Sequence, residues 1–186
     1  MKKNLLSAVA VMALSMTSQA QEIEFGAKAG LNIADMGGDA ETSGSRTGFH
    51  VGGVAEIKFS EEFSVQPELL YSMQGAKSDV SGAELETKLD YINLPIMAKY
   101  YVMEGLSIEA GPQVGFLMSA KTDGNDVKDN TKSIDFGFNI GAGYELSNKM
   151  FFQARYNLGL SDINDIDGVD QKATNNVISL SVGYKF

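Results

Sequence analysis

His50 is the only histidine in the sequence, so it is the first residue to test for catalytic chemistry. A histidine beside a serine and a carboxylate is the arrangement that activates the nucleophile of many hydrolases. Ser64 and Glu56 are the candidates for those two partners. No nucleophile motif surrounds Ser64, so we predict a hydrogen-bonding role for His50 in a protein that is not an enzyme.

The acidic segment Asp162–Asp170 is the candidate for a metal site. Its sequence, Asp-Ile-Asn-Asp-Ile-Asp-Gly-Val-Asp, contains the carboxylates and amides that Ca²⁺ prefers. The spacing fails the EF-hand pattern, because Ile166 occupies the fifth position and Ala173 the twelfth. We therefore expect a solvated acidic loop, with no metal and no cofactor. Weak binding of a divalent ion is the alternative.

Twelve charged or titratable side chains lie on the polar face of segments in which polar and apolar residues alternate. Such alternation has a period of two, which is the period of a β-strand. If the strands close into a narrow barrel, these side chains point inward and opposite charges pair, giving a plugged lumen in preference to a pore. We predict a lumen charge network of Glu24, Lys28, His50, Glu56, Lys58, Glu68, Lys99, Glu109, Asp135, Glu145, Arg155 and Lys185.

Eight segments show this alternation, and the C-terminal segment shows it without interruption. There, every second residue from Ile178 to Phe186 is apolar, and the residues between them are small or polar. A tilted membrane strand needs about 9 to 11 residues, a length that the segments reach. The predicted strands are Ile23–Ile33, Thr47–Phe59, Phe63–Met73, Tyr91–Val102, Leu106–Ser119, Ile134–Leu146, Met150–Leu160 and Ile178–Phe186.

The connections between these segments alternate in length. Three are tight turns, at 60–62, 103–105 and 147–149, whereas four are long and polar, at 34–46, 75–87, 120–132 and 161–173. Long loops therefore lie at one end of the molecule, and short turns and both chain ends lie at the other. The sequence predicts an all-β fold, an eight-stranded antiparallel up-and-down transmembrane β-barrel, with termini in the periplasm and long loops extracellular.

A soluble lipocalin-like barrel has the same alternation with its faces reversed, so a second observation is needed. The polar face carries many glycines as well as the charges, and small residues are useful only inside a crowded lumen. The apolar face carries no charge in any segment. Aromatic residues such as Tyr101 and Phe151 cluster near the turns, and Tyr91 belongs to a looser second girdle. We therefore place the apolar face against lipid.

Three prolines interrupt the predicted strands: Pro67, Pro95 and Pro112. Proline has no backbone N–H to donate to a strand ladder. We expect a local bulge or irregular pairing near each one.

The first 20 residues have the pattern of a secretory signal peptide. Lys2 and Lys3 precede an apolar segment that is too short to span a membrane, and small residues precede the expected cleavage between Ala20 and Gln21. Residues 21–186 then form one barrel domain, with 13 basic and 24 acidic residues and a net charge of −11. This acidic balance excludes nucleic acid as an expected partner. The chain has no cysteine, so burial and hydrogen bonds must stabilise it.

The chain ends in Tyr184-Lys-Phe186, with both aromatic residues on the apolar face of the last strand. A C-terminal aromatic residue in an alternating strand resembles the signal that the barrel-insertion machinery recognises. We expect Tyr184 and Phe186 to be that signal. Outer-membrane lipid and the insertion machinery are the partners that this interpretation implies.

Two segments carry a family resemblance: Ser64-Val-Gln-Pro-Glu-Leu-Leu-Tyr-Ser-Met-Gln-Gly75 and Leu89-Asp-Tyr-Ile-Asn-Leu-Pro-Ile-Met-Ala-Lys-Tyr-Tyr101. Gly111–Phe116 and Gly141–Leu146 continue it. The mature sequence resembles the PorT-like outer-membrane β-barrels of Bacteroidota, and its architecture is similar to the small OmpA and OmpX barrels of the porin family. The resemblance implies an eight-stranded outer-membrane barrel. PorT is associated with type IX secretion, but the motifs belong to the scaffold and carry no activity.

The expected function is structural, or an interaction with a surface partner through the four long loops. A narrow channel for ions or small solutes is the first alternative. An accessory role in a type IX secretion complex and a soluble ligand-binding barrel are the others.

Overall fold

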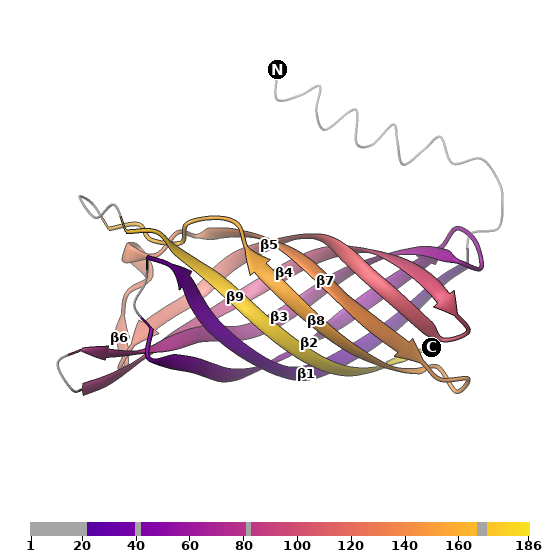
Figure 1. The fold of residues 1–186 in the computed structure, drawn as a ribbon, viewed down its shortest axis with the longest axis horizontal. Coiled ribbons are helices and arrows are strands. Elements are labelled where there is room, and N and C mark those ends of the chain that lie inside the picture. The colour runs from indigo at the N-terminus through magenta and orange to yellow at the C-terminus, as the bar shows by residue number, and fades with distance from the viewer. Residues whose placement is uncertain (1–21, 40–41, 81–82, 167–170) are drawn as a thin grey trace, which may run out of the picture.

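Eight long antiparallel strands form a closed ring in the computed structural model, which describes residues 22–39, 42–80, 83–166 and 171–186. Each strand pairs with its neighbours in the order β4-β3-β2-β1-β9-β8-β7-β5, and pairing of β4 with β5 closes the ring (Figure 1). The long strands are β1 (Glu22–Gly38), β2 (Gly44–Lys58), β3 (Phe63–Val80), β4 (Ala83–Met103), β5 (Leu106–Thr122), β7 (Ile134–Glu145), β8 (Met150–Gly159) and β9 (Ala173–Lys185). The predicted fold class is therefore confirmed.

The two ends of the barrel differ in their connections, as the sequence predicts. We call the end with the turns 60–62, 103–105 and 147–149, together with the C-terminus, the turn end. The opposite end, which we call the loop end, carries β6 (Asn125–Asp126) (Figure 1). The short 3₁₀ helix η1 (Lys128–Asn130) follows β6. The predicted signal peptide and its cleavage site between Ala20 and Gln21 lie outside the described residues.

The loop end is more regular than the sequence indicates. The segment 75–87, expected to be a long loop, continues β3 and β4 as a paired hairpin from Gly75↔Lys88 to Val80↔Ala83. Pairing between β1 and β9 likewise extends to Gly38↔Ala173. These segments lack clean alternation, because beyond the membrane neither face of a strand needs to be uniformly apolar. The prediction that these segments are long loops between the strands was therefore wrong in these parts.

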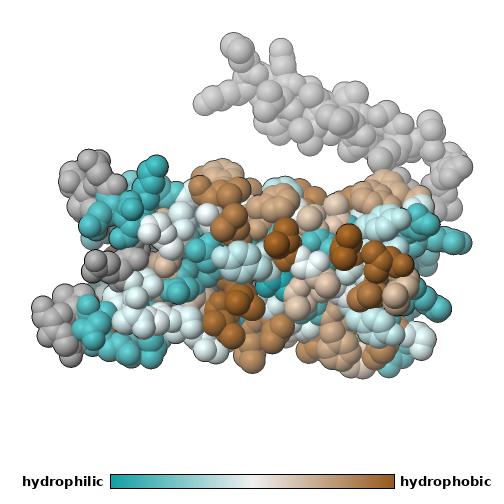
Figure 2. Space-filling model, in the orientation of Figure 1, coloured by the Kyte–Doolittle hydropathy of each residue, from teal (hydrophilic) through white to brown (hydrophobic). Residues whose placement is uncertain are grey.

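The two faces of the barrel wall have opposite chemistry. Apolar residues point outward and stay exposed: Phe25 is 57 % exposed, Leu180 54 % and Ile140 53 %. The charged residues point inward, where Glu56 and Lys185 are both 0 % exposed. Figure 2 shows apolar side chains gathered along the middle of the outer wall, with polar side chains toward both ends. Lipid, not a protein core, is the environment that suits such an outer wall.

Each proline pairs with one neighbouring strand and interrupts the ladder to the other. Pro67 pairs with Ile96 of β4, whereas the β2–β3 ladder skips the positions opposite Pro67 and Gln66. The ladder is interrupted in the same way on one side of Pro95 and of Pro112. The register is unchanged across these gaps, and its shifts occur elsewhere, such as between Asp90 and Tyr91. Irregular pairing was therefore predicted correctly, but the prolines create no bulge.

Among the described residues, no helix has the length and apolar character needed to cross a membrane.

Candidate functional site in the barrel lumen

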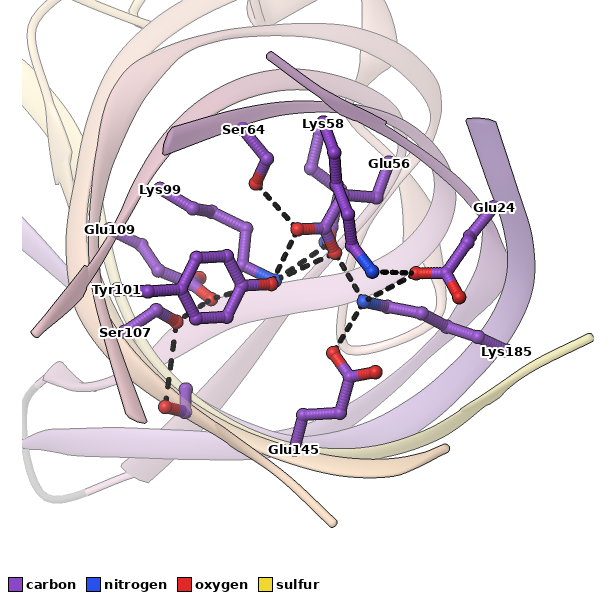
Figure 3. A network of polar contacts seen from close by, with 12 residues as sticks. Glu24, Glu56, Lys58, Ser64, Lys99, Tyr101, Ser107, Glu109, Glu145 and Lys185 are labelled. Atoms are coloured by element: carbon purple, nitrogen blue, oxygen red, sulfur yellow. Dashed lines mark hydrogen bonds and ion pairs between the residues drawn. The ribbon is translucent and has the colours of Figure 1, made fainter. Parts of the chain in front are cut away.

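Glu56 of β2 is the centre of the polar cluster in the turn-end half of the lumen (Figure 3). Its carboxylate accepts hydrogen bonds from Ser64 Oγ at 2.5 Å, Tyr101 OH at 2.5 Å and Lys99 Nζ at 3.0 Å. It also pairs with Lys185. Four donors from β3, β4 and β9 therefore converge on one buried carboxylate. Their convergence compensates the large cost of removing that charge from water.

Lys185, the penultimate residue, joins strands on both sides of β9. Its ammonium lies 2.5 Å from Glu145 Oε2 of β7 and 3.7 Å from Glu24 Oε2 of β1, and it also pairs with Glu56 of β2 (Figure 3). The side chain is completely buried. Through this side chain, β9 is linked on the lumen side to β7, β1 and β2, of which only β1 is its neighbour in the ring.

A second layer of ion pairs lies next to the first. Arg155 Nη2 lies 2.8 Å from Glu68 Oε1 and 2.7 Å from Glu109 Oε2. Lys28 Nζ lies 2.7 Å from Glu68 Oε2 and donates to Gln153 Oε1 at 3.2 Å. All of these side chains are at least nine-tenths buried. The guanidinium bridges two carboxylates, a role for which a planar donor is better suited than an ammonium.

The two layers form one connected network. Lys99 links them, because its ammonium contacts Glu56 and lies 3.9 Å from Glu109 Oε1. At the turn end, Glu24 pairs with Lys58 at 2.7 Å and with Lys149 at 2.9 Å. Hydrogen bonding to Glu24 raises the pKa of the Lys149 ammonium, which lies in the turn. The network thus joins the carboxylates Glu24, Glu56, Glu68, Glu109 and Glu145 to Lys28, Lys58, Lys99, Lys149, Arg155 and Lys185.

Ten of the twelve predicted lumen residues take part in this network, and His50 and Asp135 do not. Asp135 accepts a hydrogen bond from Ser161 Oγ at 2.7 Å near the loop end, and within the described chain no ion pair forms on it. Tyr101, Ser64 and Lys149 belong to the site but were not predicted for it. Tyr101 and Phe151 were assigned to the aromatic girdle, yet Tyr101 reaches Glu56 and Phe151 is buried in the lumen.

His50 has the predicted hydrogen-bonding role, and its partners are not the candidate residues Glu56 and Ser64. Its Nδ1 lies 2.8 Å from Asn32 Oδ1, and its Nε2 lies 2.8 Å from Ser181 Oγ. The Asn32 amide nitrogen donates to Ser72 Oγ and to the Met73 carbonyl, which leaves its oxygen facing the imidazole. This assigns the proton to Nδ1, so the Ser181 hydroxyl donates to Nε2.

A serine, a histidine and an asparagine in this order resemble a hydrolase triad, but the surroundings do not suit catalysis. His50 is 3 % exposed and Ser181 7 %. The adjoining lumen cavity, lined by polar groups that include Asn32 and His50, has a volume of about 30 Å³. That volume holds about one water molecule, far too little for an ester or amide substrate. We interpret the three residues as a hydrogen-bonded strut across β1, β2 and β9.

Glycines create the space that these inward side chains need. A Cβ on Gly30 would lie 2.6 Å from His50 Cε1 and would also collide with the Leu180 carbonyl. A Cβ on Gly141 would lie 2.7 Å from Arg155 Cγ. Larger residues at these positions would therefore displace the imidazole and the guanidinium. The predicted use of glycine in a crowded lumen matches this geometry.

A small apolar cluster closes the lumen at the loop end. Leu89 and Tyr91 of β4 pack with Leu117 and Ala120 of β5 and with Ile163 of the segment that follows β8. Each is 5 % exposed or less. We call these five residues the apolar cap. The sequence does not indicate it, because Ile163 lies in an acidic stretch and Tyr91 fits an aromatic girdle.

Asp162, the first residue of the acidic segment, anchors the cap. Its Oδ1 accepts the backbone N–H groups of Ala173 at 2.9 Å and of Asn164 at 3.0 Å, and Lys132 Nζ lies 3.3 Å from Oδ2. These donors hold the pKa of the carboxyl below its usual range. Residues 167–170 of the segment lie outside the described residues. In the part of the chain that is described, no group of His, Cys, Asp and Glu is arranged to hold a metal ion.

Solved structures with the same fold include surface proteins of two bacteria. Neisserial surface protein A is 17 % identical, and the match covers 90 % of this chain and 100 % of that one, with a TM-score of 0.59. Ail, the attachment invasion locus protein of Yersinia pestis, in complex with the heparin analogue sucrose octasulfate, is 16 % identical, with 89 % and 99 % coverage and a TM-score of 0.56. Identities this low establish a common fold alone.

Sequence comparison identifies the family. No curated protein matches the sequence. The family model described as "Outer membrane protein beta-barrel domain" matches residues 18–165, which is most of the chain. The chain therefore belongs to the outer membrane protein β-barrel domain family.

Proposed function

We propose that this protein is a non-conducting outer-membrane barrel that presents its loop end to a partner at the cell surface. In this proposal the turn end and both termini lie in the periplasm, and the loops are extracellular. The long hairpins at one end and the tight turns at the other support this orientation. The barrel is then a rigid support, and recognition occurs outside the membrane.

The filled lumen is the observation that carries the proposal. The ion-pair network occupies the turn-end half, and the apolar cap closes the loop end. The cavity between them has a volume of about 30 Å³, and eight strands leave an interior just wide enough for side chains. This geometry disfavours the alternative of a channel for ions or small solutes. It equally disfavours catalysis at His50.

Planar-bilayer recording tests this proposal. The mature chain, inserted into a bilayer and shown to be folded by heat-modifiable gel migration, should give no discrete conductance steps. A Glu56→Ala/Lys185→Ala double variant removes bulk and charge from the network together and is the positive control, because a partly emptied lumen should leak ions. Steps from the unmodified chain that vanish on neutralising Glu56 or Arg155 would overturn the proposal in favour of a channel.

The charge of the loop end constrains the partner. The segments 34–46, 75–87, 120–132 and 161–173 contain 13 acidic and 6 basic residues. A surface with this excess repels polyanions, so the partner is expected to be neutral or basic. The heparin analogue in the Ail structure gives a direct comparison. Heparin beads at low salt should fail to retain the folded barrel, and retention would contradict this part of the proposal.

A role as an accessory component in type IX secretion, and an origin in Bacteroidota, are supported only by the resemblance to PorT-like barrels. The resembling segments Ser64–Gly75 and Leu89–Tyr101 form β3 and β4, so they belong to the scaffold. Affinity purification from detergent-solubilised membranes tests this role. Stoichiometric recovery of secretion components would support it, and recovery of the barrel alone would exclude a stable complex.

A further inference from the structure

Two lysines face each other on the outer wall of the barrel near the loop end. Lys88 of β4 and Lys121 of β5 are direct partners in the antiparallel ladder, and both are exposed. The next pair, Thr87 and Thr122, points the other way and is joined by a 3.1 Å hydrogen bond between hydroxyls. Leu89, on the same face as Thr87, is buried in the lumen. Lys88 and Lys121 therefore project from the outer wall.

Like charges directly opposite each other in a ladder are unfavourable unless nearby carboxylates neutralise them. Two carboxylates lie near the lysine pair, and both have other partners. Glu86 lies 3.2 Å from Lys88 but also pairs with Arg46 at 2.9 Å. Asp126 is opposite Lys121 in the ladder, but its carboxylate accepts the backbone N–H of Lys128 at 2.9 Å. Among the described residues, the Lys121 ammonium has no hydrogen bond or ion pair, so the lysine pair lacks a complete set of counter-charges.

The lysines lie next to the apolar part of the wall. Phe116 and Met118, which precede Lys121 on β5, are 40 % and 54 % exposed. Lys128 Nζ donates to the Met118 carbonyl at 3.1 Å, which brings a third ammonium to this strand. Lysines just beyond an apolar belt extend their ammonium groups to the depth of the lipid headgroups. A lipid phosphate at that depth would supply the negative charge that the lysine pair lacks.

We propose that Lys88 and Lys121, assisted by Lys128, bind the phosphate of an anionic lipid headgroup in the leaflet at the loop end. The assignment of this leaflet as the outer one rests on the proposed orientation. The site itself requires only that the barrel lies in a membrane. Binding there would hold one lipid against β4 and β5, below the hairpin that extends beyond them, and it is independent of any partner at the loops.

The test measures the heat-unfolding midpoint of the folded mature barrel in detergent, by gel migration. The probes are lipid A with its phosphates and the same lipid A after dephosphorylation. Phosphorylated lipid A should raise the midpoint by several degrees, whereas the dephosphorylated form should not. Lys88→Gln/Lys121→Gln should lose most of this shift, and Lys88→Arg/Lys121→Arg should keep it. Native mass spectrometry should show the corresponding loss of one bound lipid.

Lys77→Gln/Lys132→Gln is the matched control. These lysines also lie at the loop end, but they pair with Glu84 at 2.8 Å and with Asp162 at 3.3 Å. The control should keep the lipid-dependent shift. Three results would overturn the proposal. The Lys88→Gln/Lys121→Gln variant could show the same lipid-dependent shift as the unmodified chain. Dephosphorylated lipid A, or inorganic phosphate, could raise the midpoint of the unmodified chain as much as phosphorylated lipid A does. A conducting lumen would instead refute the proposed function and leave this lipid site intact.

Discussion

The ammonium of Lys185 lies 2.5 Å from the carboxylate of Glu145, so β9 is joined on the lumen side to β7, from which β8 separates it in the ring. The same ammonium also pairs with Glu56 and lies close to Glu24. A single residue therefore connects the two sides of the seam between β9 and β1. Glu24 and Glu56 have further cationic partners, whereas Lys185 forms the one ion pair of Glu145 among the described residues.

Replacing Lys185 with methionine should be strongly destabilising. The substitution keeps the length of the side chain but leaves Glu56 and Glu145 without their shared cation. Breaking a buried ion pair by removing one partner costs about 3 to 5 kcal/mol. Urea unfolding in detergent micelles measures the loss. Lys58→Met is the matched control, because Lys58 is partly exposed and Glu24 keeps Lys149, so its loss should be below about 1 kcal/mol.

Arg155 and Glu109 should show strong energetic coupling. Arg155→Met alone removes the guanidinium that neutralises the buried carboxylates of Glu68 and Glu109. Glu109→Gln alone removes one of the two carboxylates that neutralise the Arg155 guanidinium. The double variant removes both charges, so its destabilisation should fall short of the sum of the single losses by about 1 to 3 kcal/mol. A double-mutant cycle on unfolding free energies gives this value. Additive losses would mean that the 2.7 Å contact contributes nothing.

Gly30 and Gly53 should respond in opposite ways to alanine. A Cβ on Gly30 would collide with the Leu180 carbonyl and with His50, whereas one on Gly53 meets only the Gly26 carbonyl at 3.8 Å. Gly30→Ala should therefore prevent or severely impair folding. Gly53→Ala should be neutral or stabilising by up to about 1 kcal/mol, because alanine reduces the entropy of the unfolded chain. Heat-modifiable migration of refolded protein distinguishes the two outcomes.

Anchoring of the apolar cap by Asp162 should depend on pH. The Ala173 and Asn164 amides lower the folded-state pKa of Asp162. The contribution of Asp162 to the stability of the folded state is therefore fully present above its unfolded-state pKa of about 4. The contribution is lost as the pH falls through the folded-state value. Hydrogen exchange at the two amides, corrected for the intrinsic rate, should lose protection in that acidic range. Asp162→Asn should weaken protection at neutral pH and abolish the pH dependence.

Tyr184 and Phe186 should be needed for assembly. Both side chains point outward and are 51 % and 74 % exposed, so neither stabilises the lumen. Phe186→Ser should reduce the amount of heat-modifiable barrel in the outer membrane several-fold while refolding in detergent stays normal. Phe152→Ser is the control, since Phe152 is an outward aromatic residue near the same end and is 46 % exposed. Equal assembly of both variants would exclude an insertion signal at the C-terminus.

Processing at the predicted signal cleavage site is tested separately. Mass spectrometry of protein purified from membranes should give an N-terminus at Gln21 and the loss of residues 1–20. An intact N-terminus, or one further along the chain, would contradict cleavage after Ala20.

The number of strands, their direction and the face that each side chain occupies were predictable, because lipid requires one rule of the outer wall: its side chains are apolar. Leu180 and Phe138 follow that rule, and they are 54 % and 40 % exposed. The hairpin at 75–87 was missed because the rule stops at the membrane surface. Gly75 and Ser78 there resemble residues of a loop, yet both are paired across the hairpin.

The partners inside the lumen were not predictable from the sequence. Which side chains meet across a barrel depends on the stagger of the strands, which alternation alone does not define. His50 illustrates this, because its imidazole forms a hydrogen bond with Ser181 by occupying the space that Gly30, which has no side chain, leaves open. Ser64 was a candidate partner of His50 in the sequence, but it donates to Glu56. Complementary charge on the inner face was visible in the sequence, whereas the pairing is defined by the three-dimensional arrangement of the strands.

The opposite chemistry of the two faces of β9 is the central claim, and one pair of cysteine variants tests it directly. The chain has no native cysteine, so Leu180→Cys and Ser179→Cys each introduce a single thiol, on the outer wall and beside the lumen cavity respectively. Each thiol is coupled to a nitroxide before the chain is folded into liposomes. Oxygen, which concentrates among acyl chains, should relax the label at Leu180→Cys strongly, and a water-soluble nickel chelate should relax neither label. Strong relaxation of the Ser179→Cys label by the nickel chelate, with weak relaxation of the Leu180→Cys label by oxygen, would contradict the account.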